Sequence, residues 1–140
     1  MTSKTTVPKL EDKKLEWHLI DVKDKVLGRV STEIAKLLMG KDKVEQTLNQ
    51  NWGDKVVVIN ASQFRLTGKK MKEKEYKHYT GYHGGLITEG IQSLLKRKPT
   101  EALKLAVKRM LPDNKLRKVR MANLYIYKDA EHPHEAQLTK

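Results

Sequence analysis

The sequence has no cysteine among its 140 residues. Disulfides and thiolate metal sites are therefore excluded, and a reducing compartment suits such a chain. Long hydrophobic runs are also missing, because no apolar stretch approaches the roughly 20 residues of a membrane-spanning helix. Residues 1–14 contain neither an apolar signal core nor an arginine. We therefore expect a protein of the cytoplasm, or of an organelle with its own expression machinery, and no membrane partner.

Apolar side chains and acids are both in short supply. Hydrophobic residues make up 38% of the chain against 33% for charged residues, so we expect a small core beneath a large charged surface. The length fits one domain that can bury a hydrophobic core without disulfides or a structural metal ion to stabilise it. Acids number 17 against 29 Lys and Arg, which leaves a formal net charge of +12. This surplus favours nucleic acid over a small-molecule substrate, with an acidic membrane surface as the lesser alternative.

The surplus of positive charge is concentrated in one stretch. Residues 96–120 hold ten Lys or Arg and two acids, and so carry +8 of the net charge. Apolar residues such as Leu103, Val107 and Met110 run through it at helical spacing. The stretch therefore predicts helices with one face in a core and the other strongly positive, rather than a disordered tail. A rigid positive face suits a polyanion because each neutralised phosphate releases condensed counterions.

The first half of the chain predicts a parallel sheet. WHLID at 17–21 is typical of a strand, and KVVVIN at 55–60 is a β-branched run typical of a strand buried on both faces. Between them the apolar spacing predicts a helix from Leu27 to a stop at Gly40. Strand, helix and strand in this order form a βαβ unit, whose two strands are parallel.

The second half predicts a basic loop region at 64–86, followed by helices and one more strand. The elements expected after this loop are, in order, a helix with Thr88 as its N-cap, a break at Pro99, a helix with Thr100 as its N-cap, a helix at 114–122, a strand at 123–127 and a polar tail. We expect residues 1–14 to be an N-terminal arm, and 15–140 to be a single α/β domain.

Residues 80–85, TGYHGG, are rich in glycine. Such a loop lets backbone N–H groups approach a phosphate, although a plain turn explains the same glycines equally well. The neighbouring residues favour nucleic acid, because they alternate cations that hold phosphates with rings that stack on unpaired bases. These neighbours are Lys74, Lys77, His78, Tyr79, Tyr82 and His83.

A second basic group lies within the helical stretch. Lys104 and Lys108 are one helical turn apart, and like charges at this spacing oppose helix formation by a few tenths of a kcal/mol, roughly. A solvated surface is the ordinary explanation of a charge run. Acids are nearly absent here, however, so we favour a bound polyanion that relieves the repulsion between the lysines. The group continues with Arg109, Lys115, Arg117, Lys118 and Arg120.

Two ligand-binding sites are disfavoured by their patterns. LTGKK at 66–70 is not a P-loop, because Gln63 stands where the pattern requires glycine and no Ser or Thr follows the lysine. His132 and His134 beside Glu135 lack the further ligands that a metal needs. We therefore expect no metal there, and a turn-like tail is the preferred interpretation.

Two alternative functions stay open at this point. An enzyme acting on RNA or nucleotides would need Asp21 or Asp54 clustered with His78 or His83 at one sheet edge, and we find no convincing set of acid, base and nucleophile. A free-standing regulatory binder of RNA or DNA would differ from a structural RNA-binding protein only in its partner.

Eight segments occur in order between residues 16 and 138. They are WHLID, KVLGR with the helix to LLMGK, GDKVVVINA, LTGKK, YTGYHGGL, KRMLPDNKL, NLYIY and EHPHEAQ. Together they resemble protein thirteen of the large ribosomal subunit, in its bacterial form. The resemblance implies a three-layer α/β/α fold around a parallel four-stranded sheet. It also implies direct binding to large-subunit ribosomal RNA, neighbouring ribosomal proteins as partners, a part in early subunit assembly, and no enzymatic activity, cofactor or small-molecule substrate.

The resemblance also implies which residues face RNA. They are Arg29, Lys41, Lys43, Lys69, Lys70, the 80–85 loop with Gly84 and Gly85, and Lys108, Arg109, Asn114, Lys115, His132 and His134.

The chain departs from the family pattern at three places. Residues 44–50, VEQTLNQ, replace a loop that usually bears proline, tyrosine and histidine, so RNA contact is not expected there. His83 stands at a usual proline, and Arg117 at a frequent glycine. These changes suggest a divergent lineage.

Overall fold

The computed structural model describes residues 8, 9, 11 and 13–138. Most of the predicted arm at 1–14 therefore lies outside the described residues. In the described part of it, the Lys13 ammonium donates a hydrogen bond of 2.7 Å to the Asn51 carbonyl oxygen. The chain just before the first strand is thus tied to the loop that follows the first helix.

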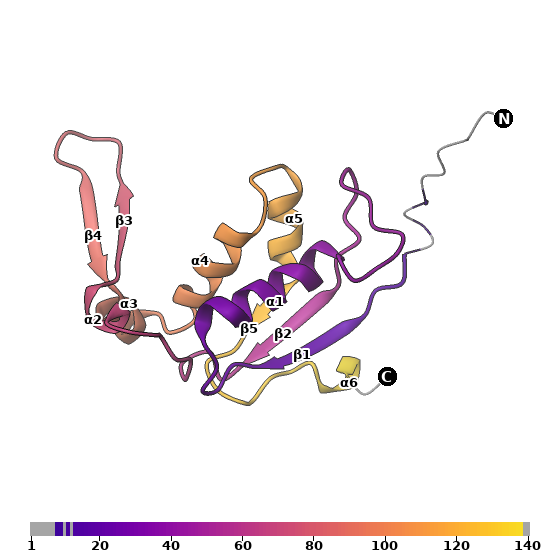
Figure 1. Ribbon diagram of the computed structural model, residues 1–140, viewed down its shortest axis with the longest axis horizontal. Helices are drawn as coiled ribbons and strands as arrows, with labels where there is room; N and C mark the ends of the chain where they lie inside the picture. Colours follow the sequence, from indigo (N-terminus) through magenta and orange to yellow (C-terminus); the bar gives the residue numbers. More distant parts are fainter. Residues whose placement is uncertain (1–7, 10, 12, 139–140) are drawn as a thin grey trace.

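A parallel sheet forms the centre of the molecule (Figure 1). β1 (Trp17–Asp21) and β2 (Lys55–Ile59) are parallel, and α1 (Leu27–Met39) connects them. β5 (Leu124–Ile126) lies on the other side of β2, also parallel. The βαβ prediction and the strand near 123–127 are confirmed.

The sheet has three parallel strands in the described residues, in the order β1-β2-β5, rather than the expected four. The β-branched run of β2 explains its central place, because Val56, Val57 and Val58 are all 0% exposed.

The two faces of the sheet are covered differently. α1, α4 (Glu101–Met110) and α5 (Leu116–Ala122) lie over one face, where α1 and α4 contribute buried side chains to the same core as β2 (Figure 1). The opposite face is covered by rings. Trp17 stacks on Tyr125 at a centroid distance of 5.6 Å, and His134 lies 5.1 Å and 4.7 Å from these two rings. A one-turn helix, α6 (Glu135–Leu138), follows in the predicted polar tail.

The expectation of a loop at 64–86 is wrong. The segment contains α2 (Lys70–Glu73) and β3 (Glu75–Tyr79), and β4 (Leu86–Gly90) pairs antiparallel with β3 as a separate hairpin. Figure 1 shows this hairpin standing away from the three-stranded sheet. Its side chains are mostly exposed, so the sequence contains no alternating apolar pattern that would predict the hairpin.

The helices after the hairpin begin close to the predicted residues, with one correction. Thr88 is not an N-cap, because it pairs with Lys77 inside β4 and α3 (Ile91–Arg97) starts after Gly90. Thr100 does occupy the N-cap position of α4, although its side chain makes no capping hydrogen bond. The expected break at Pro99 lies between α3 and α4.

A close approach between α1 and the start of β2 sets the end of the helix. Gly40 caps α1 with φ of 69°, in the left-handed region that favours glycine. A Cβ on Gly53 would overlap the Leu38 carbonyl group, so only glycine fits there without a backbone shift. Within the described residues, no helix combines the length and apolar character needed to cross a membrane.

Candidate nucleic-acid interface

α4 has one face in the core and one face in solvent. Leu103 and Val107 are 0% exposed, whereas Lys104 and Lys108 are exposed. The amphipathic pattern predicted from residues 96–120 is confirmed for this helix. The core face therefore fixes the direction in which the two lysines point.

An open hollow of about 630 Å³ lies between α4 and the segment that leads into α5, and we call it the α4–α5 hollow. It brings together cations from both sides, including Lys104 and Lys108 from α4 and Lys118 from α5. Its lining residues are Lys104, Lys108, Asn114, Lys115, Arg117, Lys118 and Met121.

The two arginines of α5 differ from these lysines. Arg117 is half-buried and forms an ion pair with Asp113. Arg120 is only 3% exposed, its Nε has no hydrogen-bond partner among the described residues, and burial lowers its pKa. Arg120 therefore does not lie on the exposed basic face, because α5 turns its side chain inward.

A second hollow, of about 290 Å³, lies where α2 meets α1 and α4, and we call it the Tyr76 hollow. It joins Lys70 and Lys74, which belong to the basic region at 64–86, with Arg109 from the helical stretch at 96–120. The Tyr76 ring lies 5.2 Å from the Lys74 ammonium and 5.6 Å from the Arg109 guanidinium. Sequence analysis did not single out Tyr76, which is buried in the core at the base of the hairpin.

The tip of the hairpin presents rings to solvent. Tyr79 is 63% exposed and Tyr82 is 79% exposed, and His78 and His83 are exposed as well. Backbone hydrogen bonds close the turn, since the Thr80 N–H donates to the Gly85 carbonyl oxygen at 3.0 Å.

The tip glycines also have a conformational role. Gly81 and Gly84 have positive φ of 91° and 71°, so the turn itself accounts for these two residues. Lys77 lies beside the tip, 3.6 Å from Glu75 in an exposed ion pair.

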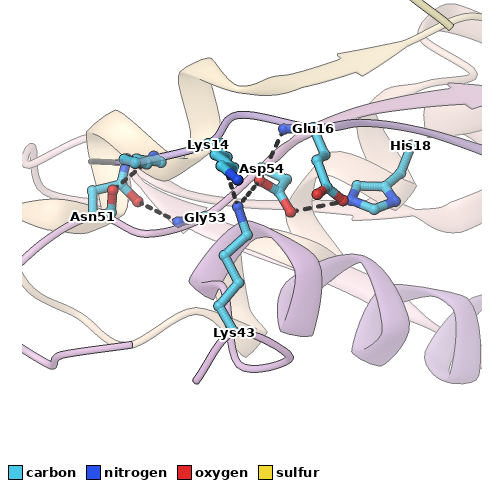
Figure 2. Close-up of polar contacts among 8 residues, drawn as sticks. Lys14, Glu16, His18, Lys43, Asn51, Gly53 and Asp54 are labelled. Carbon is cyan, nitrogen blue, oxygen red and sulfur yellow. Dashed lines mark hydrogen bonds and ion pairs between the residues drawn. The ribbon is translucent and has the colours of Figure 1, made fainter. Parts of the chain in front are cut away.

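A buried carboxylate at the amino end of β2 holds three other groups (Figure 2). Asp54 accepts hydrogen bonds from the Glu16 backbone N–H at 3.2 Å and from the Lys43 ammonium, and its other oxygen lies 3.1 Å from His18 Nε2. Lys43 also donates to the Lys14 carbonyl oxygen at 2.6 Å. The Lys43 side chain, which the resemblance assigns to RNA, is thus engaged within the protein.

Glu16, His18 and Asp54 are the one group of three potential metal ligands that the described part of the chain brings together, within 4.8 Å. The Lys43 ammonium already contacts the Asp54 carboxylate, and burial and the Lys43 charge lower the pKa of nearby Lys13. The cluster therefore acts as an internal ion pair. In the sequence Asp54 is a candidate only for the enzyme hypothesis, and no local spacing signals its contact with residues 36 to 38 positions earlier.

His132 and His134 lie in the ring cluster on the far face of the sheet. The Tyr127 hydroxyl and His134 Nε2 are 2.9 Å apart, and the His134 backbone N–H donates to His132 Nδ1 at 3.2 Å. Both histidines are half-buried. Their polar atoms therefore stabilise the C-terminal segment.

The carboxylates and histidines of the enzyme hypothesis are not brought together. Asp21 ends β1 and accepts hydrogen bonds of 2.9 Å from the Lys23 N–H and the Asn60 amide, which lower its pKa. Asp54 lies at the other end of the same sheet, and His78 lies in the separate hairpin. Neither Asp21 nor Asp54 therefore meets His78 at one sheet edge, and the histidine that Asp54 contacts is His18.

The remaining residues that the resemblance assigns to RNA are each exposed, at separate places on the surface. Arg29 projects from the first turn of α1, Lys41 follows the end of α1, and Lys69 precedes α2. In the divergent loop, Val44 is 99% exposed and Leu48 is 87% exposed.

A family model described as ribosomal protein L13 matches residues 15–133. The chain belongs to the ribosomal protein L13 family. The match covers the parallel sheet, the hairpin and both basic helices.

Bacterial members of the L13 family agree over nearly the full length. A large ribosomal subunit protein uL13 of Sulfurihydrogenibium sp. is 50% identical over 93% of this chain and 87% of its own length. The uL13 protein of Finegoldia magna is 45% identical over 96% of this chain and 94% of its own, and that of Citrifermentans bemidjiense is 49% identical over 98% and 96%.

Proposed function

We propose that this chain is a structural component of the large ribosomal subunit, in the bacterial cytoplasm or in an organelle of similar descent. It binds large-subunit ribosomal RNA directly, supports early assembly of the subunit and contacts neighbouring ribosomal proteins. Residues 15–140 act as one RNA-binding domain. Relatives with 45–50% identity carry the name of a large-subunit protein, which supports this assignment.

One observation carries the RNA-binding part of the proposal. Lys104 and Lys108 are exposed on a helix whose opposite face, at Leu103 and Val107, is completely buried. The helix cannot turn its lysines away without losing its core contacts. The positive face is therefore preorganised, which lowers the entropy cost of holding phosphates.

The proposed interface combines three exposed groups. The first is the α4–α5 hollow, the second is the Tyr76 hollow, and the third is the hairpin from Lys77 to Gly85. Arg29 and Lys69 are exposed beside the Tyr76 hollow, next in sequence to its lining residues Gly28 and Lys70. Arg29 itself lines another hollow, together with Asp24 and Glu33. We leave out Lys43, Arg120, His132 and His134, whose polar groups are buried or engaged within the protein. Lys41 is exposed and joins the interface at its edge.

A filter-binding titration of large-subunit RNA fragments tests RNA binding. We expect the logarithm of the association constant to fall linearly with the logarithm of salt concentration, because several phosphates are neutralised. A flat response would contradict the proposal. The purified chain should also sediment with large subunits after a high-salt wash, and retention by free RNA alone would indicate a free-standing regulatory binder instead.

A double substitution tests the residues. Lys108→Ala with Arg109→Ala should weaken binding about tenfold or more and lower the salt slope by about two, one for each lost phosphate contact. Lys23→Ala with Lys128→Ala removes the same charge from exposed positions outside the interface and serves as the control. Circular dichroism should show that both variants are folded. Equal affinity of the two folded variants would contradict the assignment of Lys108 and Arg109.

A further inference from the structure

Two surface hollows differ from three others in their charge. The α4–α5 hollow is lined by four lysines and by Arg117, which is paired with Asp113 outside the lining, and the Tyr76 hollow is lined by three cations. Among the described residues, no acid lines either hollow. Each of three other hollows carries two carboxylates in its lining. These are Glu16 and Glu45, Asp24 and Glu33, and Glu89 and Glu101. Because a lining carboxylate repels a phosphate, the first two hollows are the ones suited to an RNA backbone.

The two acid-free hollows lie on different sides of α4. Successive residues of an α-helix are about 100° apart around the axis. Lys104 and Lys108 are therefore within about 40° of each other, while Arg109 and Met110, which line the Tyr76 hollow, lie about 100° or more away from Lys108. The body of the helix, about 10 Å across with its side chains, separates them.

The hollows are fixed relative to each other. α4 packs against α1, and Tyr76 belongs to the same core as Leu103 and Val107. The ring of Tyr76, held beside Lys74 and Arg109, connects the second hollow to that core. Neither set of cations can move toward the other without disturbing buried side chains.

We propose that each hollow receives a separate backbone segment of the RNA, so that α4 is a wedge between two strands that the protein holds together. The proposal rests on the RNA binding proposed above and names its mode. A single strand would have to wrap around α4 to reach both sets of cations. Two segments reach them without bending, and the cations between them screen their mutual repulsion.

Directed hydroxyl-radical probing tests this arrangement. The chain has no cysteine, so Lys118→Cys in the α4–α5 hollow and Lys70→Cys in the Tyr76 hollow each provide a unique site for a tethered iron chelate. Gln137→Cys on α6 gives the background. We expect the two probes to cleave large-subunit RNA at two stretches that belong to different strands of its secondary structure.

Two results would overturn the proposal. Cleavage by both probes within one continuous strand would show a single wrapped segment, and background cleavage from either probe would show that its hollow is empty of RNA. Filter binding of the three labelled proteins is measured first. Failure of all three, and of the unlabelled chain, to retain RNA would instead refute the proposed function itself, so the two failures are distinguishable.

A pair of matched variants tests the energetic independence of the hollows. Lys104→Ala with Lys108→Ala removes two charges from the first hollow, and Lys74→Ala with Arg109→Ala removes two from the second. Each double variant leaves both probe positions, 118 and 70, available for the chelate. It should lower the salt slope by about two and should abolish cleavage only from the probe in its own hollow. Loss of both cleavage patterns in either folded variant that still retains RNA would contradict two separate segments.

Discussion

The three-stranded sheet and the β3–β4 hairpin differ in both composition and burial, since β2 of the sheet is KVVVI and β3 of the hairpin is EYKHY. In β2 the residues Val56, Val57 and Val58 are completely buried. In the hairpin Tyr76 is the one buried residue of its ten strand residues, and Leu86 is 61% exposed. The sheet is stabilised by side-chain packing, whereas the hairpin relies on backbone pairing and on its base.

The base of the hairpin is where the two regions meet. Tyr76 reaches into the main core, and the Ile91 N–H donates to the Lys74 carbonyl oxygen at 2.9 Å. Arg97 and Glu89 form an ion pair at 2.6 Å that links α3 to β4. The sheet therefore contributes most of the packing that stabilises the fold, whereas the hairpin presents most of its side chains to solvent.

The largest difference should appear when one aliphatic side chain is shortened in the core beside the sheet, on α4, and another in the hairpin. Leu103→Ala removes a completely buried side chain and should lower the free energy of unfolding by roughly 2–5 kcal/mol. Ile87→Ala in β4, where the side chain is 45% exposed, should cost less than about 1 kcal/mol. Urea denaturation followed by circular dichroism measures both losses. Equal losses in the two variants would contradict the expected difference in stability.

A pair of glycines gives the same contrast through overpacking. Gly53→Ala forces a methyl group against the Leu38 backbone and should destabilise the protein by about 1–3 kcal/mol or more. Gly90→Ala at the end of β4 meets no atom within 4 Å and has no positive φ, so its effect should be small. Thermal unfolding of the two variants decides between these outcomes. A destabilised Gly90→Ala variant with an unchanged Gly53→Ala variant would reverse the expectation.

We expect the exposed rings of the hairpin to contribute to RNA affinity but little to the stability of the fold. Tyr79→Ala with Tyr82→Ala removes two exposed rings and should weaken RNA binding by about 1–3 kcal/mol for each base that stacks on them. Tyr79→Phe with Tyr82→Phe keeps the rings and should retain most of the affinity. Fluorescence anisotropy with an RNA fragment measures this, and similar losses in both variants would assign the effect to the hydroxyls instead.

The smallest effect concerns an exposed carboxylate at the edge of the sheet. Hydrogen bonds from Lys23 and Asn60 lower the pKa of Asp21 in the folded protein. Its contribution is therefore present above the unfolded-state pKa of about 3.9 and is lost as pH falls through the folded-state value. Asp21→Asn should reduce the loss of unfolding free energy at low pH by less than about 1 kcal/mol, because solvent screens this exposed group. Urea midpoints compared at neutral and acidic pH test it, and parallel profiles would contradict it.

The sequence predicted those elements whose burial leaves a periodic pattern. The β-branched run at 55–60 and the helical spacing from Leu27 to Gly40 both mark residues that face a core. The hairpin was missed because its strands face solvent, and tertiary contact at Tyr76 alone fixes its place. The fourth parallel strand came from the family resemblance, and the described residues form three.

The sequence predicted that the candidate site is positively charged, but not which of its residues lie together in the fold. Net charge pointed to residues 96–120, and the structure confirms that Lys104 and Lys108 are exposed. Sequence spacing could not show that Arg109 lies with Lys70 and Lys74, because that hollow joins residues more than thirty positions apart. Nor could it show that Arg120 turns inward or that Asp54 engages Lys43, since both depend on side-chain direction in the folded chain.

The shape of the β3–β4 hairpin gives the molecule reach. Tyr79 lies three residues beyond Tyr76 in β3, which is about 10 Å along the strand, and Tyr82 lies farther out in the turn. A narrow ribbon of two strands can enter a crevice that would exclude the much broader sheet and helices. The chain can therefore touch the interior of a folded partner while its bulk stays at the partner's surface.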